Sequence, residues 1–68
     1  MAEPVPEYMH SPEIRSLENA AKSCEENGQY LRASLLYQQI CDIIVNTYHD
    51  MEKADQYRKK ARECQHAK

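Results

Sequence analysis

Three cysteines and three histidines are the side chains best suited to metal binding or nucleophilic catalysis: Cys24, Cys41, Cys64, His10, His49 and His66. The cysteine spacing matches no zinc or redox motif, and no histidine stands at a recognisable offset from a cysteine. Free cysteines in a reducing compartment pack as small apolar residues. We therefore predict no metal site and no cofactor, and we expect the cysteines to lie in the interior.

Closely spaced carboxylates are the other candidates for catalytic chemistry. Glu25 and Glu26 are adjacent, and Glu13 and Glu18 precede them. At helical spacing these side chains fall on a solvent face, where they need no acid–base role. A chain of 68 residues also has little room for a substrate cavity. We predict no catalytic residues and a protein that is not an enzyme but acts through its surface.

Charge is distributed unevenly along the chain. The formal net charge is −2, with three basic and six acidic residues in 1–34 but six basic and three acidic residues in 51–68. The overall acidity, and the lack of aromatic residues interleaved with the basic ones, argue against a nucleic-acid partner. No apolar run approaches the roughly 20 residues of a membrane span, and the first residues lack the pattern of a signal peptide. We expect a cytoplasmic protein without a transmembrane segment.

The elements that must position any binding surface are helices. Ser11-Pro12-Glu13 is a strong helix start, because the Ser hydroxyl caps free N–H groups and Pro fits the first helical position. One apolar stripe then follows at steps of three and four: Ile14, Leu17, Ala20, Ala21 and Cys24. Gly28, the only glycine of the chain, supplies the left-handed turn that ends this helix. A first helix over about 12–27 is predicted.

A second helix carries a broader apolar face, as the central helix of a bundle requires: Tyr30, Ala33, Leu36, Tyr37, Ile40, Ile43 and Ile44. Poor helix formers then collect over 43–50, and Asp50 can cap a third helix. The prediction is all-α, a small three-helix bundle of up-down-up topology. Its domain spans 11–66, with helices over about 12–27, 30–47 and 51–66, behind a flexible N-terminal tail of residues 1–10 that contains Pro4 and Pro6.

An unbroken second helix is the competing interpretation. From Tyr37 to Gln65 the chain also fits a heptad pattern with alternating steps of three and four. A continuous helix over 29–66 would make the protein an oligomerising helical hairpin or a scaffold fragment. The length of such a helix and its thin apolar seam favour a break near 46–50 and a monomer.

The segment GQYLRASLLY, from Gly28 to Tyr37, resembles one shared by tetratricopeptide repeats and by MIT domains, the microtubule-interacting and trafficking modules. Nothing repeats after it, although tetratricopeptide units normally occur in arrays. The MIT resemblance covers more of the chain, roughly 14–65, because Tyr57 and Ala61 match the Tyr and Ala of that family's third-helix signature. The resemblance to MIT domains implies an adaptor in trafficking. The alternative is a fragment of a tetratricopeptide-like scaffold.

MIT domains bind short C-terminal segments of ESCRT-III subunits in grooves between helices. The resemblance implies a partner site between the second and third helices, at these residues: Leu36, Ile43, Ala54, Arg58, Lys59 and Arg62. The last three depart from the family, which commonly has apolar or acidic residues there. A protein or peptide partner with an amphipathic segment is therefore expected, and the basic edge favours one that carries acidic residues.

Overall fold

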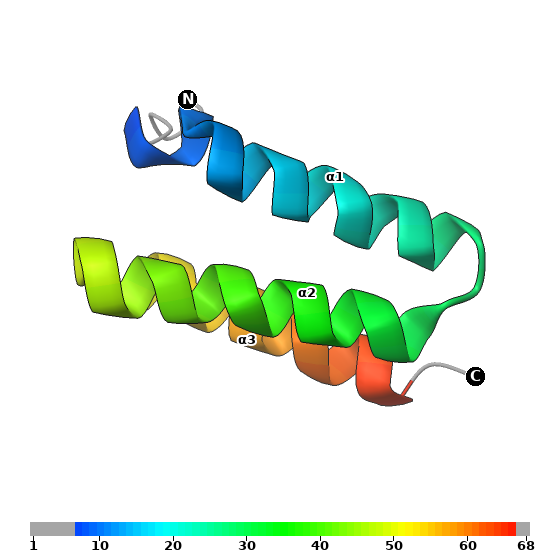
Figure 1. Ribbon diagram of the computed structural model, residues 1–68. Helices are drawn as coiled ribbons and strands as arrows, with labels where there is room; N and C mark the ends of the chain where they lie inside the picture. Colours follow the sequence, from blue (N-terminus) through cyan, green and yellow to red (C-terminus); the bar gives the residue numbers. More distant parts are fainter. Residues whose placement is uncertain (1–6, 67–68) are drawn as a thin grey trace, which may run out of the picture.

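Three helices make up the fold of the computed structural model, which describes residues 7–66. A short 3₁₀ turn, η1 (Glu7–His10), precedes α1 (Pro12–Glu26), α2 (Tyr30–Ile43) and α3 (Met51–His66), and a π-helical turn, η2 (Ile44–Tyr48), extends α2. The chain runs up, down and up through the three helices (Figure 1). The predicted all-α three-helix bundle is confirmed.

The ends of α1 form as its sequence predicts. The Ile14 backbone N–H donates to the Ser11 hydroxyl at 3.3 Å, and Pro12 occupies the first turn. At the other end Gly28 takes a φ of 76°, in the left-handed region that glycine adopts without steric cost. The Gln29 N–H then donates to the Cys24 carbonyl at 2.7 Å, which closes the turn and sends α2 back along α1.

The second reversal lies at His49 and excludes a continuous helix over 29–66. His49 has a φ of 57°, so the backbone leaves the right-handed helix there. Asp50 restarts it, because its Oδ1 accepts the Lys53 N–H at 3.2 Å. The second helix was predicted over 30–47, and the chain is helical over that stretch: regular α-helix ends at Ile43, and the π-helical turn η2 continues it to Tyr48.

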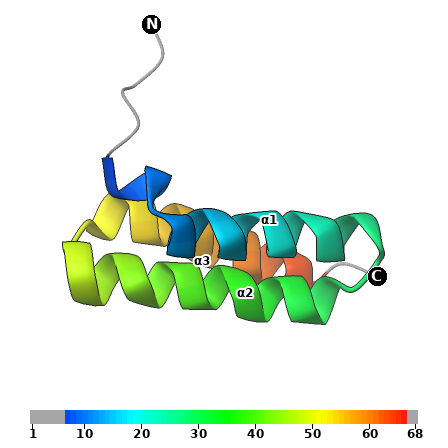
Figure 2. The same ribbon diagram turned by 45° about the horizontal axis from the view of Figure 1, so that its top comes forward.

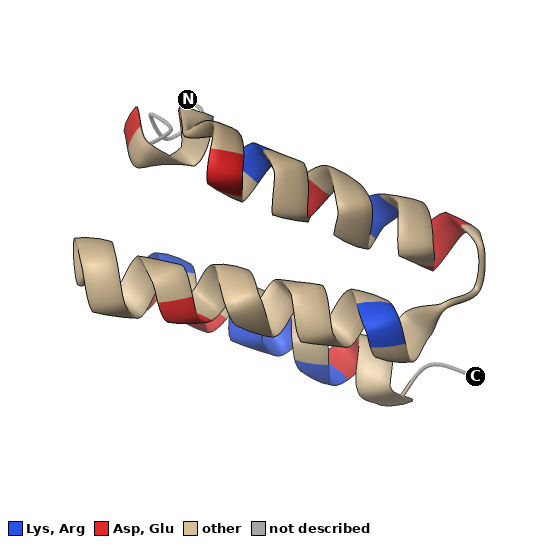
Figure 3. Ribbon diagram, in the orientation of Figure 1, with Lys and Arg blue, Asp and Glu red and all other residues tan. Residues whose placement is uncertain are grey.

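The core is centred on α2, which packs against both α1 and α3. Its fully buried side chains are of moderate size, and Tyr37, Ile14, Ile40 and Ile44 are the largest apolar ones. The three cysteines are free and buried, one in each helix, as the sequence predicts. The backbones of α1 and α3 come close to each other at few positions. Charged residues gather on these two outer helices, whereas α2 has only Arg32 and Asp42 (Figure 3).

The predicted tail is corrected at residues 7–10, which belong to the fold. Tyr8 donates its hydroxyl proton to the Asp50 carboxylate at 2.6 Å, its ring stacks on Tyr48 with centroids 4.3 Å apart, and Met9 is buried. η1 therefore covers the end of the bundle where α2 turns into α3 (Figure 2). The rest of the predicted tail, residues 1–6, lies outside the described residues.

Within residues 7–66, none of the helices combines the length and the apolar character needed to cross a membrane.

Candidate partner-binding cleft

α1 and α3 run parallel, and two side-chain hydrogen bonds fix their register. The Tyr57 hydroxyl donates to Glu18 Oε2 at 3.3 Å, and the Cys64 thiol donates to Glu25 Oε1 at 3.0 Å. Each bond joins residues that are 39 positions apart in sequence. Because the offset is the same at both bonds, each residue of α1 can be matched with the residue of α3 that lies at about the same height along the bundle. We call such a matched position a level.

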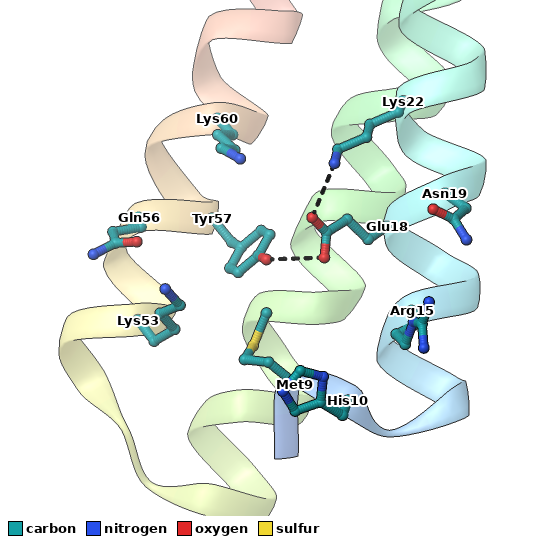
Figure 4. A pocket seen from close by; sticks show the side chains of 10 residues that line it. All are labelled: Met9, His10, Arg15, Glu18, Asn19, Lys22, Lys53, Gln56, Tyr57 and Lys60. Atoms are coloured by element: carbon teal, nitrogen blue, oxygen red, sulfur yellow. Dashed lines mark hydrogen bonds and ion pairs between the residues drawn. The ribbon is translucent and has the colours of Figure 1, made fainter. Parts of the chain in front are cut away.

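A cleft opens between α1 and α3 beside these bonds, with a volume of about 700 Å³. Its lining comes from η1, α1 and α3: Met9, His10, Arg15, Glu18, Asn19, Lys22, Lys53, Gln56, Tyr57 and Lys60. In Figure 4, Tyr57 of α3 points across the opening toward Glu18 of α1, and Lys22 points toward the same carboxylate. Four of them are Arg or Lys and one is a carboxylate, so the cleft is basic although the chain as a whole has a net charge of −2.

The cations of the cleft stand in two rows with the same spacing. Arg15 and Lys22 are seven residues apart on α1, and Lys53 and Lys60 are seven apart on α3. The offset of 39 puts Lys53 within one residue of the position opposite Arg15, and Lys60 within one residue of the position opposite Lys22, a difference of about 1.5 Å along the axis. Like charges therefore face each other at two levels, which disfavours closure of α1 onto α3.

Glu18 lies between the two cationic levels. One of its carboxylate oxygens pairs with the Lys22 ammonium at 3.3 Å, and the other accepts the Tyr57 hydroxyl. Burial, followed by the charge of Glu18 and this hydrogen bond, raises the pKa of Tyr57 above its ordinary value. The phenol therefore stays protonated and holds Glu18 in place as a fixed negative charge at the middle of the cleft.

Lys60 is held by the aromatic floor of the cleft. Its ammonium lies 5.3 Å from the ring centroid of Tyr57 and 5.7 Å from that of Tyr37, within the range of cation–π attraction. No ion pair among the described residues involves Lys60, Lys53 or Arg15. These three cations are available to an anionic ligand.

The thiol at the far end of α3 is unsuited to nucleophilic chemistry. Burial, and next the hydrogen bond to Glu25, raise the pKa of Cys64 to about 11, so the thiolate is scarce at neutral pH. Over residues 7–66 no three side chains of the metal-binding types come together. The arrangement offers charge and hydrogen-bond donors for binding.

The six residues predicted from the sequence do not share one surface. Leu36 and Ile43 are half-buried and pack against the core, and Ala54 is buried with 1% of its surface exposed. Arg58 lines a smaller hollow of about 230 Å³ with three α2 residues, Gln38, Cys41 and Asp42. Positions 36 and 43 lie about 140–160° around α2 from positions 38 and 41, so they face away from that hollow.

The remaining two predicted residues lie on the outer face of α3. The Lys59 ammonium pairs with Asp55 at 3.6 Å, and Arg62 is exposed beside it and lines a separate shallow hollow with Lys59, Glu63 and His66. The structure thus places Arg58, Lys59 and Arg62 away from the α1–α3 cleft.

Sequence reasoning missed the cleft because it grouped the basic residues of α3 as one face. The structure divides them: Lys53 and Lys60 lie toward α1, Arg58 lies beside α2, and Lys59 and Arg62 lie on the outer face of α3. The seven-residue spacing of Arg15 with Lys22, matched by Lys53 with Lys60, was the available signal.

Comparison of the chain with protein-family models, with curated proteins and with solved structures found no match.

Proposed function

We propose that the protein is a non-enzymatic protein-interaction module that binds a short amphipathic, acidic segment of a partner protein between its helices. The observation that carries this proposal is the basic cleft between α1 and α3, whose unpaired cations lie on two rigid helices and whose floor is aromatic. A groove of this kind suits a partner segment that supplies carboxylates and one apolar side.

An ESCRT-III-like tail is the partner that the MIT resemblance of 14–65 suggests, and the resemblance is the only support for that identity. The cleft supports a more general statement, which is that the partner must be acidic where it meets Arg15, Lys53 and Lys60. The surface predicted from the sequence, at Arg58, Lys59 and Arg62, is the alternative docking site on the same module.

Titration of the ¹⁵N-labelled protein with acidic helical peptides, ESCRT-III tail peptides among them, tests the proposal. We expect amide shifts that follow the cleft-lining residues of α1 and α3, with affinity that falls as salt is added because exposed charges are screened. Peptides that cause no shifts at millimolar concentration would reject the interaction function. Shifts confined to the Arg58 side of α3 would move the site to the α2–α3 surface.

Two charge-reversal variants distinguish binding in the α1–α3 cleft from binding at the Arg58 surface beside α2. Lys53→Glu places a carboxylate in the cleft, whereas Arg58→Glu makes the same kind of change on the same helix outside it. We expect Lys53→Glu to weaken peptide binding at least tenfold, which corresponds to about 1.4 kcal/mol, and Arg58→Glu to change it less than threefold. Circular dichroism of both variants checks that α3 is retained.

A further inference from the structure

The charges of the α1–α3 cleft form an ordered pattern along its length. Arg15 and Lys53 make the first level, Glu18 with Tyr57 makes the second, and Lys22 and Lys60 make the third. The sign therefore changes from positive to negative and back to positive. A ligand that matches this order must present the opposite sequence of charges.

The spacing of the levels is set by the helices that carry them. Seven residues of α-helix rise about 10.5 Å, so the two cationic levels are separated by that distance and the carboxylate of Glu18 lies near the midpoint. Because α1 and α3 are parallel and in register, both walls repeat the same interval.

Helical and extended ligands meet this interval differently. Residues on one face of a strand recur every second position, so their side chains are separated by about 7 or 13 Å and do not match the interval of about 10.5 Å between the two cationic levels. Residues seven apart on a helix lie on one face about 10.5 Å apart, and the residue four positions after the first lies on that face between them. A helix can therefore place three side chains on the three levels at once.

We infer that the cleft selects a partner helix with two acidic residues seven positions apart and a basic or amide residue four positions after the first. This inference rests on the proposed function and adds the register of the ligand to it. The outer acids pair with the cations of the first and third levels, and the central donor meets Glu18, which would repel a third acid.

Two peptides of identical composition test the register. In the first, glutamates stand seven residues apart with a lysine four residues after the first glutamate; in the second, the lysine and the second glutamate are exchanged. A side-chain lactam on the far face keeps both peptides helical, so that differences in peptide helicity do not contribute. Fluorescence anisotropy gives the dissociation constants.

We expect the first peptide to bind the wild-type protein about tenfold more tightly than the second, since the exchange sets a glutamate against Glu18 and a lysine against Lys22 and Lys60. Equal affinities would overturn the register inference and leave the interaction function standing. If neither peptide binds at millimolar concentration, the proposed function fails and the inference fails with it.

Reversal of the Glu18 charge gives a second test. Its readout is the ratio of the affinities for the two peptides, which a loss of protein stability alone would not reverse. Glu18→Lys should lower the preference for the first peptide at least tenfold and favour the peptide with the central glutamate. Glu13→Lys, the same change at an exposed position of α1, should leave the preference unchanged. Should Glu18→Lys fail to fold, Glu18→Gln is expected to lower the preference about threefold, and an unchanged preference in a folded Glu18 variant would overturn the inference.

Discussion

Single residues decide where each helix of this bundle begins and where the chain turns. Ser11 and Asp50 cap α1 and α3 with their side-chain oxygens, and both were predictable because their residue types compete for free N–H groups. The break at His49 was predictable only to within the run of poor helix formers over 43–50. The left-handed backbone of His49 lies beside the hydrogen bond from Tyr8 to Asp50, which joins residues 42 positions apart and is not specified by the local sequence.

Replacement of the first of these caps tests a stabilising role at one residue. Ser11→Ala removes the acceptor of the Ile14 N–H and should lower the free energy of unfolding by about 1 kcal/mol. Ser16→Ala makes the same change at an exposed position inside α1 and should alter stability by less than about 0.5 kcal/mol. Urea denaturation followed by circular dichroism compares them. Equal effects of the two changes would show that the cap contributes nothing.

Whole elements were predictable to different degrees. α1 and α3 follow their start signals closely, because capping residues and apolar spacing are local properties of the sequence. The π-helical type of the last turn after α2 was not predicted, because the run of β-branched residues from Ile43 weakens the helix without specifying the wider turn of η2. The cleft was not predicted: the matched spacing of its cations is visible in the sequence, but it defines one surface only when the register of α1 against α3 is known, and that register depends on how both pack on α2.

The turn between α1 and α2 gives a test at the scale of elements. Gly28→Ala puts a Cβ on a residue with a φ of 76° and should cost about 1 kcal/mol of unfolding free energy. Space is not the reason, since an added Cβ at Gly28 meets no atom within 4 Å. Gln29→Ala, at an exposed neighbour with a φ of −89°, is the matched control with an expected effect below about 0.5 kcal/mol. An unchanged urea midpoint for Gly28→Ala would contradict this role of the glycine.

Four proton donors of the folded molecule have raised pKa values, and two of them, Tyr57 and Cys64, bond α3 to α1. Burial, followed by the nearby Glu25, raises the pKa of Tyr37 to about 12, and burial also raises that of Cys64 to about 11. Tyr8 and Tyr57 are raised as well, first by burial and then by Asp50 and Glu18 respectively. All four groups favour the protonated, folded state.

The pH dependence of stability follows from the direction of these shifts. In the unfolded chain Cys64 and Tyr37 lose their protons at their ordinary pKa values of 9.0 and 10.0, below the folded values of about 11 and 12. Their stabilisation is therefore complete below about pH 9 and is lost as the pH rises toward 12. We expect helicity measured by circular dichroism to fall over this range, and tyrosine absorbance to rise with it. Full helicity at pH 12 would contradict the prediction.

The distribution of the three cysteines gives the folded chain a built-in reporter. Because each helix hides one free thiol, an alkylating reagent reaches a given cysteine only when that helix separates from its neighbours. α2 packs against both α1 and α3, and Cys41 has the smallest exposed fraction of the three, 4% against 5% for Cys64 and 9% for Cys24, so Cys41 should be modified last. The order of labelling along the sequence thus records which part of the bundle opens first.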